Sequence, residues 1–173
     1  MKKQCKNLTI LLINIFLLLS IAETISAQPF TIGQKFGGGV IFYIDRTGQH
    51  GLIAATFDQS KDATWGKSVD RSNNAIGLGI GTGALNTKKI LEDGLVDATG
   101  AAYLCGSLTL AGFKDWFLPS LFEMQLMYQN KNKIGGFSNK YYWTEAIGRR
   151  YHHVLSGIRT TNANAAVRTF TAL

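Results

Sequence analysis

The run Asp115–Met124, which reads Asp-Trp-Phe-Leu-Pro-Ser-Leu-Phe-Glu-Met, constrains local structure more than any other segment of this chain. Ser120 and Glu123 have the spacing of a capping box, in which each side chain accepts a backbone N–H group at a helix start. Pro119 precedes the cap, where its missing N–H does not weaken the helix. The pattern therefore predicts a helix that begins after Ser120. We interpret five residues of the run as a structural signature: Asp115, Trp116, Pro119, Ser120 and Glu123.

Within this signature, Trp116 is expected to fill the core, because large aromatic side chains dominate core burial. Asp115 is expected to cap or pair locally, and Arg168 is one candidate partner. Neither residue is placed in a catalytic role by the pattern.

The first 27 residues have the three parts of a secretory signal peptide. A positively charged start is followed by the apolar stretch 8–22 and then by Ala27, a small residue just before the expected cleavage point. The apolar stretch has about 15 residues, fewer than the roughly 20 that span a bilayer, so cleavage is favoured over a retained anchor. We expect residues 28–173 to be a single domain that is periplasmic, cell-surface or extracellular, with no transmembrane segment.

The charge of the mature domain narrows its possible partners, and its cysteine content bears on disulfide formation. Cleavage lowers the formal net charge from +7 to +5 and leaves 146 residues, enough for one domain with its own core. A basic surface favours anionic partners, and export makes nucleic acid the least expected of them. Cys105 is the only mature cysteine, so we expect no intrachain disulfide and a buried, inert thiol.

Local patterns predict a β-hairpin followed by helices. Residues 40–44 and 51–56 are β-prone, and the turn-forming segment 45–49 joins them. Two helices are expected before the capping box: one with Asn86 as its N-cap and its end near Gly94, and one from Asp97 toward Leu108.

Three β-prone segments follow the helical region: 141–144, 154–158 and 165–170. Strands on both sides of a central helical region favour an α+β fold over a doubly wound sheet.

Segments spread along the mature chain also match one bacterial domain family in order. They include Gly39-Val40-Ile41-Phe42-Tyr43-Ile44-Asp45, His50-Gly51-Leu52-Ile53-Ala54-Ala55, Ile80-Gly81-Thr82-Gly83, Asp115-Trp116-Phe117-Leu118-Pro119-Ser120, Tyr142-Trp143 and Val167-Arg168. The chain resembles the family named after the C-terminal domain of the Legionella collagen-like adhesin, the Lcl C-terminal domain. The resemblance implies a compact C-type-lectin-like domain with antiparallel strands and two or three short helices. It also implies carbohydrate binding, because the founding adhesin binds sulfated glycosaminoglycans.

The chain departs from this family in two places. It has no collagen-like Gly-X-Y stalk, and only Thr144 stands between Trp143 and Glu145, where the family has a run of serines or threonines. The loop beyond Trp143 is therefore expected to differ in shape.

Enzyme and metal motifs are weak or missing in this sequence. Residues 79–84 fit a dinucleotide-binding glycine pattern, but no apolar strand precedes them, so a glycine-rich surface loop is favoured. His152 and His153 are adjacent and would point to opposite faces of a strand, so they are not expected to share a metal ion. We expect no cofactor, no metal and no catalytic residues.

The best candidate for a ligand-binding surface is Arg149-Arg150-Tyr151-His152-His153, together with Trp143. Arginine binds sulfate or phosphate in a bidentate manner, and Lys131, Lys133 and Lys140 are candidates for the same face. A solvated loop without a partner is the competing interpretation, and Trp143 fits either the core or a sugar-stacking surface.

These observations favour an exported, adhesin-like, non-catalytic domain that recognises anionic or sulfated glycans or a similar envelope polymer. Oligomerisation is possible and would raise affinity through avidity. The alternatives are a structural or assembly module that binds another envelope protein and, with the least support, a hydrolase.

Overall fold

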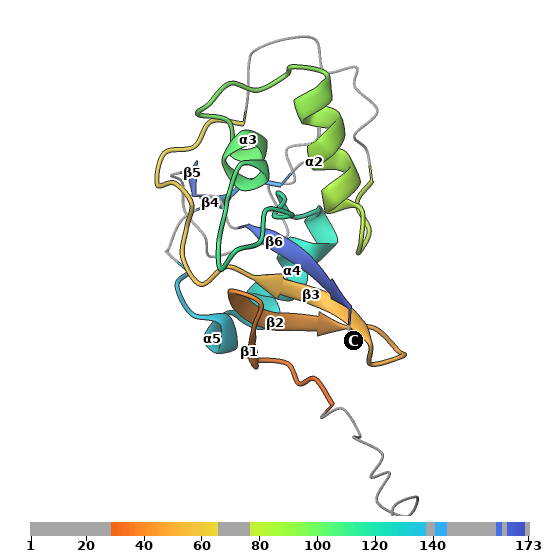
Figure 1. Ribbon diagram of the computed structural model, residues 1–173. Helices are drawn as coiled ribbons and strands as arrows, with labels where there is room; N and C mark the ends of the chain where they lie inside the picture. The colour runs from red at the N-terminus through yellow and green to blue at the C-terminus, as the bar shows by residue number, and fades with distance from the viewer. Residues whose placement is uncertain (1–28, 66–76, 138–140, 145–161, 164–165, 172–173) are drawn as a thin grey trace, which may run out of the picture.

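The computed structural model describes residues 29–65, 77–137, 141–144, 162–163 and 166–171 (Figure 1). Within these residues, an antiparallel four-stranded sheet is combined with four helices. The predicted α+β class is therefore confirmed, whereas the expected number of two or three helices is too small. Among the described residues, no helix combines the length and apolarity needed to cross a membrane.

The main sheet has the strand order β1-β2-β3-β6, and every neighbouring pair is antiparallel. Its strands are β1 (Lys35–Phe36), β2 (Gly39–Ile44), β3 (His50–Ala54) and β6 (Val167–Thr171). The last strand thus returns from the end of the chain to pair with β3, with Ile53 opposite Arg168. Strands β4 (Tyr141–Tyr142) and β5 (Asn162–Ala163) form a separate parallel pair.

The β-hairpin is confirmed in the predicted place. The Asp45 carboxylate fixes its turn, because it accepts hydrogen bonds from the Thr47 hydroxyl at 2.6 Å and the Thr47 N–H at 3.0 Å. The Thr47 hydroxyl bond is the main reason that the pKa of Asp45 is lowered. The Asp45 N–H donates to the His50 carbonyl at 2.8 Å, which closes the hairpin.

Two predicted helix starts are wrong by about one turn. Helix α2 (Gly83–Glu92) begins before Asn86, whose side-chain amide donates to the Gly77 carbonyl at 2.7 Å instead of capping the helix. Helix α3 (Ala101–Gly106) begins after Asp97, whose carboxylate accepts the Thr99 N–H at 2.9 Å in a turn. In both cases a side chain that suits a cap is used in a turn or loop.

The predicted helix after Ser120 is present as α4 (Leu121–Gln129), and the one-turn helix α5 (Lys131–Ile134) follows it. In Figure 1, α2 and α3 lie together beyond the β6 edge of the main sheet, and α4 lies behind the sheet. Of the β-prone C-terminal segments, 141–144 and 165–170 contribute to β4 and β6. The segment 154–158 lies outside the described residues.

The core forms on both faces of the sheet, because alternate residues of a strand point to opposite faces. Ile41 and Ile53 face one apolar cluster, which includes Trp116 and Cys105. Val40, Phe42 and Leu52 face the other cluster, which includes Met124 and Met127 of α4. The predicted burial of Trp116 and Cys105 is confirmed, with 2% and 0% of each residue exposed.

Candidate functional site

The structural signature surrounds one buried carboxylate, that of Glu123. The predicted capping box is present: the Ser120 hydroxyl accepts the Glu123 N–H at 3.2 Å, and the Ser120 N–H donates to Glu123 Oε2 at 2.7 Å. Both residues are 0% exposed. The helix start is therefore locked by side chains that solvent does not reach.

Glu123 also connects this helix start to the loop 79–83, which we call the glycine loop. The Gly81 N–H donates to Glu123 Oε1 at 2.8 Å, and the Gly83 N–H is a further donor to the carboxylate. The Ser120 hydroxyl donates in turn to the Gly79 carbonyl at 2.8 Å. Two segments about 40 residues apart in sequence are thus joined through the side chains of Ser120 and Glu123.

Gly83 is required by the approach of the carboxylate, and Gly81 is required by its backbone conformation. A Cβ atom on Gly83 would overlap Glu123 Oε2 and would lie 2.9 Å from the Leu118 carbonyl oxygen. Gly81 has a φ of +88°, which favours glycine. The pattern 79–84 is therefore explained by a loop that fits around Glu123, with N–H groups turned toward the protein's own carboxylate.

The charge on Glu123 is governed by two opposing effects. Burial raises the pKa of Glu123, because the ionised form has lost its hydration, while the hydrogen bonds from Ser120, Gly81 and Gly83 act in the opposite direction. No ion pair to Glu123 is present within the part of the chain that the structure describes.

The predicted pairing of Asp115 with Arg168 is confirmed. The Arg168 Nε donates to Asp115 Oδ1, and the guanidinium carbon lies 3.5 Å from the centre of the Phe113 ring. The Arg168 side chain is only 13% exposed. Asp115 therefore ties the signature to β6, which supports a structural role for this residue.

The predicted ligand residues fall into two groups. Arg149, Arg150, Tyr151, His152 and His153 lie outside the described residues, as does Lys140. Trp143 is half-buried, and its indole N–H donates to the Ala63 carbonyl at 2.8 Å while its ring packs against the core. The indole N–H edge of Trp143 thus contributes to holding the fold together.

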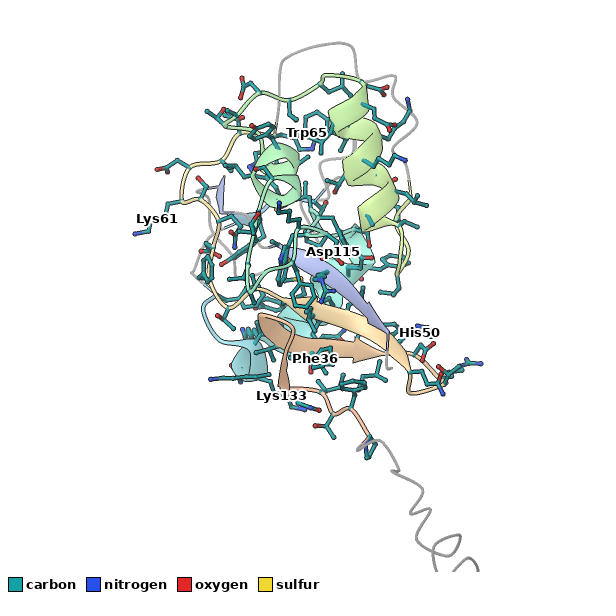
Figure 2. The ribbon with its side chains drawn as sticks, in the orientation of Figure 1. Phe36, His50, Lys61, Trp65, Asp115 and Lys133 are labelled. Atoms are coloured by element: carbon teal, nitrogen blue, oxygen red, sulfur yellow. The ribbon has the colours of Figure 1, made fainter. Side chains whose placement is uncertain are left out.

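Three exposed lysines lie on α5 and on the neighbouring strand β1. Lys131 and Lys133 belong to α5 and Lys35 belongs to β1, and we call the three the α5 cation group. The Lys131 ammonium lies 4.2 Å from the centre of the Tyr128 ring. The aliphatic stem of Lys133 would contact a Cβ atom placed on Gly33, two residues before Lys35 in the chain. In Figure 2, Lys133 lies at the same end of the domain as Phe36 of β1, far from Trp65.

No carboxylate of the described residues forms an ion pair with the α5 cation group. Among the described residues, the ion pairs are Lys88–Glu92, Lys89–Asp93 and Arg168–Asp115, and none of them involves this group. The three lysine side chains are exposed, and that of Lys131 lies over the Tyr128 ring. The sequence had indicated Lys131 and Lys133 as basic candidates, but the one-turn helix that carries them was not predicted.

The described residues contain a small depression and no metal-ligand cluster. A shallow depression is lined by Ala55, Phe57, Asp58, Gly135, Gly136 and Phe137. It offers about 10 Å³ to the centre of a water-sized sphere, which is room for about one water molecule. Within the described ranges, no three histidine, cysteine, aspartate or glutamate side chains are grouped to hold a metal ion.

Among the described residues, the exposed lysines of the α5 cation group are the candidate for a ligand-binding surface. Charged side chains are presented on short elements at one end of the domain, and the buried carboxylate supports the scaffold. In the comparisons with known proteins, no family model and no curated protein matches this chain.

Proposed function

We propose that this chain is an exported, non-catalytic domain of the Lcl C-terminal type, with a C-type-lectin-like fold, and that it recognises anionic or sulfated glycans. The observation that carries the proposal is the α5 cation group. Lys131 and Lys133 are exposed on a one-turn helix and have no carboxylate partner among the described residues. The net positive charge of the chain supports the same choice of ligand.

The local geometry suits a repeating polyanion better than a single small anion. A lysine ammonium is a point charge on a flexible stem, and in water a pair of unit charges at 4 Å contributes only about 1 kcal/mol. Several such contacts along one polymer are needed for useful affinity. Arg149 and Arg150 are the proposed bidentate partners of sulfate groups on the same chain.

The contribution of α5 can be tested with two double variants that remove the same charge. Lys131→Ala with Lys133→Ala should weaken binding to immobilised heparin about tenfold, which corresponds to about 1.4 kcal/mol. Lys88→Ala with Lys89→Ala is the matched control, because these α2 lysines already pair with Glu92 and Asp93. Binding is measured as the salt concentration that elutes each protein.

Equal losses in the two variants would show that only net charge matters and would contradict the assignment to α5.

Arg149→Ala with Arg150→Ala tests the second part of the proposed surface and should abolish retention at moderate salt. Unchanged retention of that variant would remove the segment from the proposal. Thermal unfolding of each variant provides the control for correct folding.

A further inference from the structure

Arg168 of β6 is a partly buried cation that the proposed glycan surface does not use. Its side chain is 13% exposed, and its guanidinium carbon lies 3.5 Å from the centre of the Phe113 ring. Arg168 stands opposite Ile53 in the register of the sheet, so it lies on the same face as Ile53 and the Trp116 cluster. Ile134 of α5 packs against the other face. The surroundings of Arg168 are therefore separate from the α5 cation group.

Among the described residues, the guanidinium of Arg168 forms a hydrogen bond through one nitrogen only. Its Nε donates to Asp115 Oδ1. A guanidinium has five N–H donors, so four remain on the two terminal amino groups. The one fully buried side-chain nitrogen or oxygen without a partner in the described part of the chain is Trp116 Nε1, so the terminal nitrogens of Arg168 reach solvent. Arg168 thus presents two amino groups without a described partner beside the Phe113 ring.

The position of these amino groups is fixed by three neighbours. Asp115 holds Nε, and the Phe113 ring contacts the face of the guanidinium. Gly37 approaches so closely that a Cβ atom on it would lie 2.9 Å from Arg168 Nη1. Because the Arg168 side chain is already held in place, a ligand does not have to order it on binding.

Phe113 is itself placed by a strained turn. Leu110 and Phe113 exchange two backbone hydrogen bonds, each of 3.0 Å, and so close a turn at Ala111 and Gly112. Ala111 has a φ of +53°, an uncommon conformation for a residue with a side chain, and its Cβ packs against Gly38. Such strain persists where the surroundings fix the backbone, and it is found most often at binding and catalytic sites. Phe113 remains 36% exposed, so part of its ring can contact a ligand.

The charge and shape of this surface favour one planar anion. Arg168 and the exposed Lys114 are positive and Asp115 is negative, so two positive charges and one negative charge sum to +1. Arginine binds carboxylates through paired N–H bonds. A carboxylate can remain in the plane of the guanidinium. A tetrahedral sulfate would instead turn oxygen atoms toward the face of the Phe113 ring, which is negative.

We propose that the two terminal amino groups of Arg168 bind the carboxylate of a ligand, and that an apolar part of the same ligand lies against Phe113. Asp115 is the positioning residue, because it occupies Nε and leaves the amino groups to the ligand. The ligand class is therefore a carboxylic acid with an apolar group next to the carboxylate. This site is independent of glycan binding at α5, and each can hold or fail without the other.

NMR titration of the protein with acetate, benzoate and methyl sulfate tests this site, with chloride used to keep the ionic strength constant. Acetate should shift the Arg168 Nε–H signal saturably, with half-saturation on the order of 10–100 mM. Benzoate should reach half-saturation at an about fivefold lower concentration, because its ring can pack against Phe113. Methyl sulfate should not saturate over the same range.

Arg168→Lys keeps the charge but removes the paired donors, so it should raise the half-saturation concentration of acetate about tenfold, measured from the Phe113 amide signal. Arg46→Lys is the matched control, because Arg46 is an exposed arginine of the β2–β3 turn, and it should leave binding unchanged. The proposal is overturned if acetate does not saturate the wild-type signal, if benzoate binds no more tightly than acetate, or if methyl sulfate binds as well as acetate. Equal effects of the two variants also contradict it. The wild-type titrations alone decide the question if Arg168→Lys does not fold.

Discussion

Replacement of Glu123 by alanine should lower the free energy of unfolding by about 3–5 kcal/mol. The substitution removes the acceptor of the Ser120, Gly81 and Gly83 N–H groups at once. Each buried donor left without a partner costs about 1–3 kcal/mol. The substitution also leaves a cavity at the start of α4. Urea denaturation measured by circular dichroism provides the free energy directly.

Glu92→Ala provides the reference for this measurement. Glu92 is an exposed glutamate of α2, and its only ion pair in the described structure is with Lys88, at 3.7 Å. Its loss should change stability by no more than about 0.5 kcal/mol. A loss below about 1 kcal/mol for Glu123→Ala would mean that the buried carboxylate is not the centre of the scaffold.

Gly136→Ala should be the second strongly destabilising change, with a loss of about 3 kcal/mol or more. Gly136 has a φ of +73°, and a Cβ atom there would overlap the Thr56 carbonyl group at the end of the hairpin. The chain would have to move away from this backbone contact, which joins the segment after α5 to the segment after β3. The effect is measured by urea denaturation as well.

Gly135→Ala is an unusually close control for Gly136→Ala. Its φ is +74°, and a Cβ atom there would meet nothing within 4 Å. With a ψ of 179° it lies in a backbone region that is essentially restricted to glycine, so alanine there costs about 1–3 kcal/mol without any overlap. The difference between the two variants isolates the contact with Thr56, and equal losses would show that this contact is not close in solution.

Sequence patterns predicted the parts of the fold that depend on neighbouring residues. The hairpin followed from β-prone runs around a turn, and the start of α4 followed from the Ser120 and Glu123 spacing, since both depend on contacts within a few residues. The starts of α2 and α3 were misplaced because Asn86 and Asp97 satisfy loop and turn groups that no local pattern distinguishes from a cap.

The candidate site was predicted only in part, for the same physical reason. The burial of Trp116 and the Asp115–Arg168 pair agreed with expectation. The contact between Glu123 and Gly81 was missed, because it joins residues 42 positions apart and the capping box already seemed to explain the glutamate. One signal was present in the sequence: Gly83 stands at the start of a helix, where a glycine is explained by a close contact such as the one with Glu123.

The salt dependence of heparin binding by the wild-type domain tests the proposed function most directly. Electrostatic binding of a sulfated polymer through exposed cations should weaken steeply as the ionic strength rises, because exposed charges are screened over about 8 Å at 0.15 M salt. We therefore predict binding at low salt and a large loss of affinity by several hundred millimolar. Absence of binding at low salt, or affinity that does not change with salt, would contradict glycan recognition and would favour the assembly module.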